Sequence, residues 1–173
     1  LAWTELGDLN TGRDTYQGGI GHATAALIGG GKTAPGRVAC SEEFDGTVWT
    51  EGGDINTARN EHAAAGTQNA GLIFGGDDSK AVTETYDGSS WTEVGDLNVG
   101  RQAFGSFGTQ TAGLGFGGLV SAPQDVSEEF DGTNWAEGND LNQARYWGGG
   151  FGTQTAGLYA GGYDPGAYSA TSE

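Results

Sequence analysis

Hydrophobic and polar residues alternate in a short stretch that occurs three times along the chain. In the copy VTETY, Val82, Glu84 and Tyr86 fall on one face of a predicted strand, and the two threonines fall on the other. The same alternation recurs in CSEEF and VSEEF, at 40–44 and 126–130. A glutamate that shares a face with two apolar residues is predicted to be partly buried.

Each of these strands belongs to a longer unit, for which residues 101–138 serve as the example. Four strands are predicted in it: QAFGSFG, TAGLGFG, DVSEEF and NWAEG. Asp-Gly separates the third strand from the fourth and predicts a tight hairpin, because glycine accepts positive φ. The first strands are rich in glycine and alanine, as at 63–65 and 148–150, which suits an innermost position with little room for side chains.

The unit is repeated along the whole chain. Its markers are Arg13, Arg59, Arg101 and Arg145, and Trp3, Trp49, Trp91 and Trp135. Both series advance by 46, 42 and 44 residues, and a period in this range predicts a β-propeller of four-stranded blades. We therefore predict one all-β domain over 1–173, a four-bladed propeller with four antiparallel strands per blade. The repeat units span about 7–52, 53–94, 95–138 and 139–173.

The two ends of the chain carry parts of one unit. Residues 1–6 match the segment after the hairpin in the other copies, and ATSE at 170–173 matches ACSE at 39–42. We predict that 1–6 form a strand beside the C-terminal one, which completes the last blade, closes the ring and removes two sheet edges. A four-bladed ring closed in this way is expected to be a monomer. The alternatives are half of an eight-bladed ring made by two chains, and a fragment of a longer array.

A partly buried carboxylate needs a partner, and the repeated arginine is the only basic residue available once per unit. We predict an arginine–glutamate pair in each blade or across each blade junction, with Glu42, Glu84 and Glu128 as the first set of acceptors. The alternative acceptor is the glutamate two residues after each tryptophan: Glu5, Glu51, Glu93 or Glu137.

The chain resembles kelch repeats in its glycine pair, in the aromatic residue that ends the third strand, and in the later tryptophan. The glycine pairs are Gly30-Gly31, Gly75-Gly76, Gly117-Gly118 and Gly161-Gly162. Kelch proteins are β-propellers that act mostly as binding scaffolds, and a few, such as the galactose oxidase type, carry a catalytic metal. The chain departs from kelch repeats in having four units rather than six or seven, and in the shorter step from Tyr86 to Trp91.

The repeated strings GTQTAGL, DGTNW and GDLN are also similar to the kelch-like repeat proteins of marine bacteriophages and environmental sequences. Virion or tail-fibre roles are suspected for those proteins. This second resemblance implies a virion or extracellular location and carries no site residue.

Charge narrows the range of partners. The net charge of −16, with only seven basic residues, opposes binding to nucleic acid and to anionic membrane surfaces. No apolar run reaches the roughly 18 to 20 residues that a membrane span requires, so no membrane insertion is expected. The lone Cys40 excludes a disulfide within the chain, and its alignment with Val82 and Val126 predicts a small core residue.

Function is expected where the copies differ, because residues present in every unit serve the unit. The loops between the second and third strands differ most, at 32–37, 77–81, 119–125 and 163–168. Loops on one face of a rigid scaffold are common binding sites. Candidate ligand-binding residues on this face are Lys32, Arg37, Asp77, Asp78, Lys80, Asp125, Tyr163, Asp164 and Tyr168. The alternative is that these loops are plain solvated connectors.

Four aromatic residues near the C-terminal end lie outside the repeated aromatic positions. Such residues are able to stack on sugar rings in a glycan-binding role. Tyr146 and Trp147 begin an inner strand, so we interpret them as packing within the last blade. For Tyr163 and Tyr168 both stacking on a ligand and packing stay open.

No catalytic residue, metal or cofactor is expected. His22 and His62 are the only histidines, and the neighbours Glu42 and Glu43 point to opposite faces of a strand, so they cannot flank one sugar. The spacing of the acidic loop residues does not match a twelve-residue calcium loop.

The sequence thus favours a non-catalytic binding or structural module, such as a virion or tail-fibre propeller or a surface adhesin. Its partner would be a protein or glycan on a cell or virion surface. The alternative is a glycan-active hydrolase or a metal-dependent oxidase that uses the loop face or the axial channel.

Overall fold

The chain is built of short antiparallel strands, as the alternation predicts. The structure is a computed structural model and describes residues 3–15, 19–164 and 166–173. Strands are the only regular elements in these ranges. The described residues contain no helix of the length and apolarity that a membrane span requires. The all-β prediction is confirmed.

Three repeat units each form a four-stranded antiparallel sheet in which neighbours in the chain are neighbours in the sheet. Sheet 1 contains β1 (Gly19–His22), β2 (Ala25–Gly29), β3 (Ser41–Phe44) and β4 (Trp49–Glu51). Sheet 2 contains β5 (Ala63–Thr67), β6 (Ala70–Phe74), β7 (Thr83–Tyr86) and β8 (Trp91–Glu93). Sheet 3 contains β9 (Gly105–Thr109), β10 (Ala112–Phe116), β11 (Ser127–Phe130) and β12 (Trp135–Glu137).

The predicted Asp-Gly hairpins join the third and fourth strands of these sheets. In sheet 1, Asp45 Oδ1 accepts hydrogen bonds from the backbone N–H groups of Thr47 and Val48, at 2.8 and 2.9 Å. Gly46 has φ +97°, a left-handed conformation that a side chain would strain. The register places Phe44 opposite Trp49, and the other two sheets repeat this aromatic pair as Tyr86 with Trp91 and Phe130 with Trp135.

The fourth unit departs from the predicted four strands. Its sheet 4 pairs only β13 (Gly149–Thr153) with β14 (Ala156–Ala160), and β15 (Tyr163–Asp164) pairs with β16 (Ala167–Tyr168) as a separate hairpin. Residues 172–173 continue along β14, since the backbones of Tyr159 and Glu173 exchange two hydrogen bonds of 2.8 Å.

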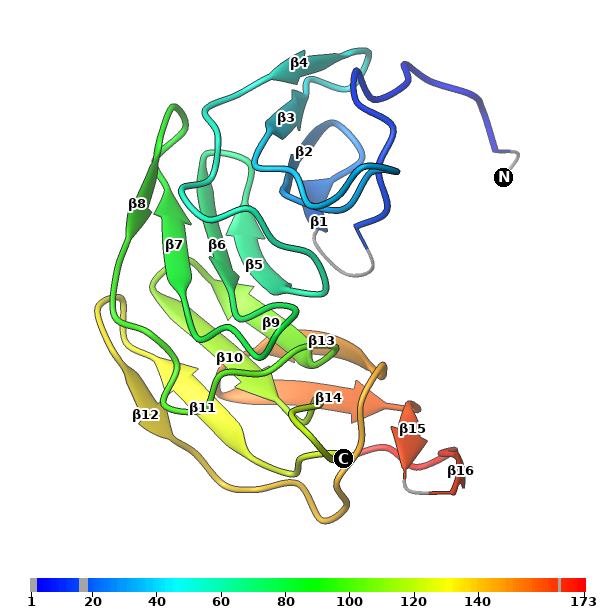
Figure 1. Ribbon diagram of the computed structural model, residues 1–173, viewed down its shortest axis with the longest axis vertical. Helices are drawn as coiled ribbons and strands as arrows, with labels where there is room; N and C mark the ends of the chain where they lie inside the picture. The colour runs from blue at the N-terminus through cyan, green and yellow to red at the C-terminus, as the bar shows by residue number, and fades with distance from the viewer. Residues whose placement is uncertain (1–2, 16–18, 165) are drawn as a thin grey trace.

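The predicted closing strand does not form, so closure of a four-bladed ring is not confirmed. Residues 3–6 have no strand structure and Trp3 is fully exposed; Leu1 and Ala2 lie outside the described residues. In Figure 1 the N-terminal segment that starts at residue 3 lies well apart from the C-terminal end of the chain. In the other sheets the fourth-strand tryptophan lies opposite an aromatic residue of the third strand.

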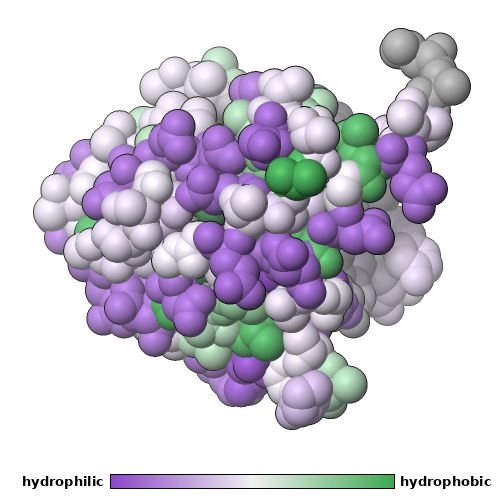
Figure 2. Space-filling model, turned by 90° about the horizontal axis from the view of Figure 1, so that it is seen from above, coloured by the Kyte–Doolittle hydropathy of each residue, from purple (hydrophilic) through white to green (hydrophobic). Residues whose placement is uncertain are grey.

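The sheets follow one another in an arc, with their first strands innermost (Figure 1). Strand β1 packs against β5, β5 against β9, and β9 against β13. The glycines and alanines of these strands permit the close approach: a Cβ on Gly150 would lie 2.9 Å from the carbonyl oxygen of Ser106. Most of the face seen in Figure 2 is hydrophilic, and its apolar residues form separate small patches.

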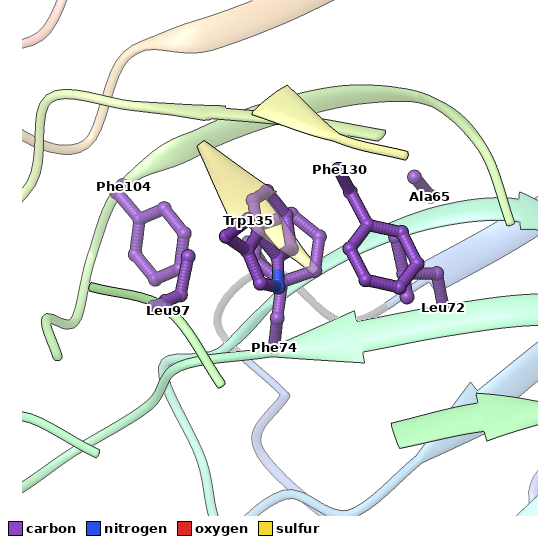
Figure 3. Packing of buried hydrophobic residues seen from close by; sticks show 8 residues of the cluster. Ala65, Leu72, Phe74, Leu97, Phe104, Phe130 and Trp135 are labelled. Carbon is purple, nitrogen blue, oxygen red and sulfur yellow. The ribbon is translucent and has the colours of Figure 1, made fainter. Parts of the chain in front are cut away.

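The hydrophobic core lies between consecutive sheets rather than within any one of them. Between sheets 2 and 3, the Trp135 ring lies 4.5 Å from that of Phe74 and 5.0 Å from that of Phe130 (Figure 3). The other two junctions bury Ile20, Leu27, Ile55, Ala64, Ile73, Tyr86 and Trp91, and Phe107, Phe116 and Tyr159. Cys40, predicted as a core residue, is half-buried. Because each sheet buries its faces only against neighbours, the repeated unit specifies the whole arrangement.

Each repeated arginine lies against a glutamate of its own unit, and for three of them the glutamate belongs to the first set of acceptors that the sequence suggests. The pairs are Arg13–Glu42, Arg59–Glu84 and Arg101–Glu128, with Arg145–Glu173 as the fourth. In sheets 2 and 3 the two nitrogen–oxygen distances are 2.5 Å and both partners are fully buried. Two further residues bond the carboxylate, and the sequence does not predict them. In sheet 2, the backbone and side-chain N–H groups of Asn56 donate to Glu84 Oε2, and Thr57 N–H donates to Oε1.

The same contacts hold the carboxylate of sheet 1 in its charged form. Burial raises the pKa of Glu42, but the amides of Asn10 and Thr11 and the guanidinium of Arg13 stabilise the anion. Together they bring the pKa of Glu42 below its ordinary value.

The glycine pairs join each sheet to the next. The N–H of Gly76 donates to the carbonyl of Arg101 in sheet 3 at 2.9 Å, and Gly31 and Gly118 make the same bond to Arg59 and Arg145. The first glycine of the pair has no room for a side chain, because a Cβ on Gly75 would lie 2.7 Å from the carbonyl oxygen of Arg101.

Replacing Gly75 with alanine is expected to lower the free energy of unfolding by about 2 kcal/mol or more, because the position combines positive φ with backbone contact. The measurement is urea denaturation followed by circular dichroism. Gly19→Ala is the matched control, since a Cβ there meets nothing within 4 Å. Equal stability of the two variants would contradict the role given to the glycine pair.

Candidate functional site

The loops after β2 and β6 bring together four of the candidate residues, as a charge cluster of Arg37, Asp77, Asp78 and Lys80. The Arg37 guanidinium pairs with Asp77 and, at 2.7 Å, with Asp78, and Lys80 Nζ lies 3.4 Å from Asp77. The hydrogen bond to Asp77 raises the pKa of Arg37. Opposite charges are thus already paired with one another, so the cluster fastens the loop of sheet 1 to that of sheet 2.

Two candidates lie outside this cluster. Lys32 is exposed, and its backbone pairs with those of Asp14 and Arg37 on either side. Asp125 is exposed in the corresponding loop of sheet 3, where its carbonyl accepts a hydrogen bond from Leu141 N–H. These positions give neither residue a shared site with another candidate.

Of the remaining candidates, Tyr163 and Tyr168 belong to an aromatic group together with Tyr146 and Trp147, and Asp164 lies beside it. The Tyr146 ring lies 4.8 Å from that of Trp147 and 5.4 Å from that of Tyr163. Tyr163 meets Tyr168 edge to face, with ring centroids 5.5 Å apart and an interplanar angle of 82°. Side chains from two separate segments therefore form one continuous cluster of rings.

Backbone pairing sets the positions of these rings. Tyr146 and Tyr163 exchange two backbone hydrogen bonds, of 3.1 and 2.7 Å, which hold the β15–β16 hairpin beside the start of sheet 4. Asp164 Oδ2 accepts a hydrogen bond of 2.8 Å from Gln143 Nε2, and its other oxygen accepts one from Ala167 N–H. The hairpin thus presents two tyrosines next to a fixed carboxylate and a fixed amide.

The backbone of Trp147 has a left-handed conformation that recurs at the equivalent position of two other units. Its φ is +60°, and the equivalent residues Glu61 and Ala103 have φ of +56° and +57°. This left-handed turn lets Trp147 N–H donate to the carbonyl of Ala103 in sheet 3 at 2.9 Å, just as Ala103 N–H donates to Glu61. Where the other three units have Thr15, Glu61 and Ala103, the fourth presents an indole ring.

Exposure separates the four rings into two pairs. Trp147 is 53% exposed and Tyr168 is 88% exposed, whereas Tyr146 and Tyr163 are half-buried beneath them. The interpretation of Trp147 as packing in the last blade is therefore wrong, since about half of its side chain is exposed, whereas Tyr146 does pack. The sequence carries no signal for this exposure, because the equivalent residues are Thr15, Glu61 and Ala103, and Ala103 is buried.

The aromatic group has the chemistry of a sugar-binding platform. Aromatic faces stack on the apolar C–H face of a sugar ring, while neighbouring carboxylate and amide groups bond its hydroxyls. Trp147 and Tyr168 supply exposed ring surface, and Asp164 and Gln143 supply the polar groups. The exposed ring surface of Trp147 and Tyr168 distinguishes this end of sheet 4 from the self-paired charge cluster.

The histidines and the adjacent glutamates lie elsewhere. His22 is exposed beside Thr24, and His62 is buried next to Gly30. Glu43 accepts a hydrogen bond from Tyr86, while Glu42 faces Arg13. In the part of the chain that the structure describes, no three His, Cys, Asp or Glu side chains are grouped as metal ligands would be.

Comparison with known proteins adds no family: no protein-family model matches the chain, and no curated protein matches its sequence.

His62 gives the molecule a predicted acid sensitivity. Burial, reinforced by the charge of Arg59, lowers the pKa of His62 to about 3, whereas an unfolded histidine has a pKa of 6.5. Below pH 6.5, His62 of the unfolded chain binds a proton, whereas His62 of the folded chain stays neutral. The free energy of unfolding therefore falls by about 1.4 kcal/mol per pH unit until the pH reaches the pKa of His62 in the folded chain.

His62→Phe, which copies Phe104 at the equivalent position of sheet 3, is expected to remove this term. Between pH 7.5 and pH 5, the unfolding free energy of the unchanged chain should fall by about 2 kcal/mol more than that of the variant. Urea denaturation at the two pH values measures the difference. An identical fall in both proteins would refute the assignment.

Proposed function

We propose that the chain is a non-catalytic binding module whose aromatic group recognises a glycan. The observation that carries this proposal is the pair of exposed rings, Trp147 and Tyr168, held over two supporting tyrosines beside Asp164 and Gln143. A rigid scaffold with an exposed aromatic and polar edge is the usual form of such a module.

Charge favours a neutral glycan as the ligand. The chain carries a net charge of −16, and the carboxylate of Asp164 lies within the site. Both features repel sulfated or carboxylated sugars, since like charges brought into contact cost free energy. The carboxylate is instead suited to accept hydrogen bonds from neutral sugar hydroxyls.

The scaffold is proposed to be of the kelch-like propeller type, with sheets 1 to 4 as its blades. Support comes from the repeated glycine pair, from the aromatic–tryptophan pairs and from first strands that pack innermost. Closure into a four-bladed monomer through residues 1–6 stays a prediction. On the sequence resemblance to phage kelch-like proteins, we place the module on a virion or outside the cell, as a tail-fibre or adhesin component.

Removing either exposed ring is expected to weaken glycan binding at least about tenfold, because each supplies stacking area at the centre of the site. A glycan array of neutral oligosaccharides identifies the best-bound sugar, and calorimetry with that sugar compares Trp147→Ala and Tyr168→Ala with the unchanged chain. Phe151→Ala is the matched control, because Phe151 is exposed on β13 outside the aromatic group. Absence of neutral-glycan binding, or equal loss in the control, would reject the proposal.

A further inference from the structure

A cavity of about 180 Å³ lies between sheets 3 and 4. Phe107, Leu114, Phe116, Leu141 and Tyr159 form its apolar walls, and Ser127 and Glu173 add polar groups. At the other two junctions between sheets, side chains fill the corresponding space. The neighbouring junction therefore indicates which side chain this cavity could accommodate.

The corresponding space between sheets 2 and 3 holds the tryptophan of a fourth strand. Trp135 packs there against Phe74, and its Nε1–H donates to Thr83 Oγ1 at 2.9 Å (Figure 3). In the repeat alignment Phe116 takes the place of Phe74, and Ser127 that of Thr83. The cavity therefore offers an indole ring both an aromatic wall and a hydroxyl acceptor.

The chain contains one tryptophan of this type whose side chain is fully exposed. Trp3 begins the string WTE, which is the sequence of β4 and β8. Asn10, seven residues further on, is bonded to Glu42 of sheet 1, just as Asn98 follows Trp91 and is bonded to Glu128 of the next sheet. By this rule residues 3–5 belong to whichever sheet stands before sheet 1.

The two outer faces of the arc are complementary in the same way. On sheet 4, Phe151 and Leu158 are 64% and 47% exposed, although their equivalents in sheet 1, Ile20 and Leu27, are buried against sheet 2. Sheet 1 presents an apolar hollow over the outer side of β2 to β4, lined by Leu6, Ile28, Phe44 and Trp49. One end of the chain thus offers the surface that the other end would bury.

We propose that the cavity between sheets 3 and 4 receives Trp3 of a second copy of the chain, whose sheet 1 packs on sheet 4. Among the described strands, contacts run from sheet 1 to sheet 4 in sequence, and the two outer sheets occupy opposite ends of the arc (Figure 1). The N-terminal segment leads away from sheet 4 of its own chain. A second copy carries both complementary surfaces and continues the interface already repeated inside the chain.

This contact is weaker than the internal junctions because it lacks a glutamine. Gln68, Gln110 and Gln154 each bond two carbonyls of the preceding sheet through Nε2, at 2.6 to 3.3 Å. The equivalent residue of sheet 1 is Ala23, which cannot make these bonds. Association between copies is therefore reversible and depends on concentration.

Sedimentation velocity of the whole chain over a range of concentrations tests the proposal. The expected mass rises from one chain to two or more, and Trp3→Ala shifts this rise to at least about tenfold higher concentration. Trp147→Ala removes another exposed tryptophan and should leave the masses unchanged. Ala23→Gln should shift the rise to lower concentration, because the Gly157 carbonyl would then accept the added amide.

The remaining outcomes overturn the proposal. A chain that stays monomeric at every concentration, with Trp3 open to iodide quenching, leaves the cavity without this occupant. A monomer in which Trp3 is shielded means that the chain closes on itself, as the sequence predicts. Neither result affects glycan binding, which is measured with Trp147→Ala and fails or succeeds separately.

Discussion

The structure depends on a buried charge network that each unit repeats. Arg59 bonds Glu84 and the carbonyls of Gly75 and Val82, so one side chain holds the second and third strands of sheet 2 together. Its own carbonyl accepts the N–H of Gly31 from sheet 1. A single arginine therefore joins two strands of its own sheet and also joins that sheet to the preceding one. Because hydrogen bonds to the remaining polar atoms stabilise a buried ion pair, the surrounding residues are constrained.

The asparagine of the repeated DLN or DIN string supplies further hydrogen bonds to the glutamate of each pair. Asn56 lies in the connection that runs from the outer strand of sheet 1 to the inner strand of sheet 2, and it bonds both Glu84 and the carbonyl of Trp91. The glutamate thus binds two partners, the arginine and the segment that connects sheet 1 to sheet 2. Two residues after the arginine the sequence varies between units, and the fourth unit carries Trp147 where the others have Thr15, Glu61 and Ala103.

Much of this could be predicted from the sequence where interactions are local or repeated. Alternation around Glu84 indicated a buried carboxylate, and the common stepping of arginine and tryptophan gave the unit. The hydrogen bonds of the asparagines could not be predicted in this way, because a polar residue in a repeated loop is typical of a solvated turn. Each asparagine follows a tryptophan by seven residues, and only this constant spacing indicates that it lies beside the paired glutamate of the following unit. The Arg37–Asp77 pair could not be foreseen, since it joins two loops that have no repeated pattern.

Interactions between the ends of the arc are the least predictable part. Residues 3–6 carry the sequence of a fourth strand, yet a strand forms only beside a partner, and sequence similarity does not say whether that partner belongs to the same chain. Trp147 shows the complementary limit: propensity places an aromatic residue inside, whereas about half of this side chain is exposed.

Native-state hydrogen exchange at the amides of Asn56 and Asn98 tests the central role of the network most directly. These N–H groups donate to Glu84 and Glu128 at 2.7 and 2.6 Å. If the network holds the sheets together, both amides exchange only through global unfolding, with the same free energy as the amides of β6 and β10. Exchange through a much cheaper local opening, with those strands still protected, would contradict the account.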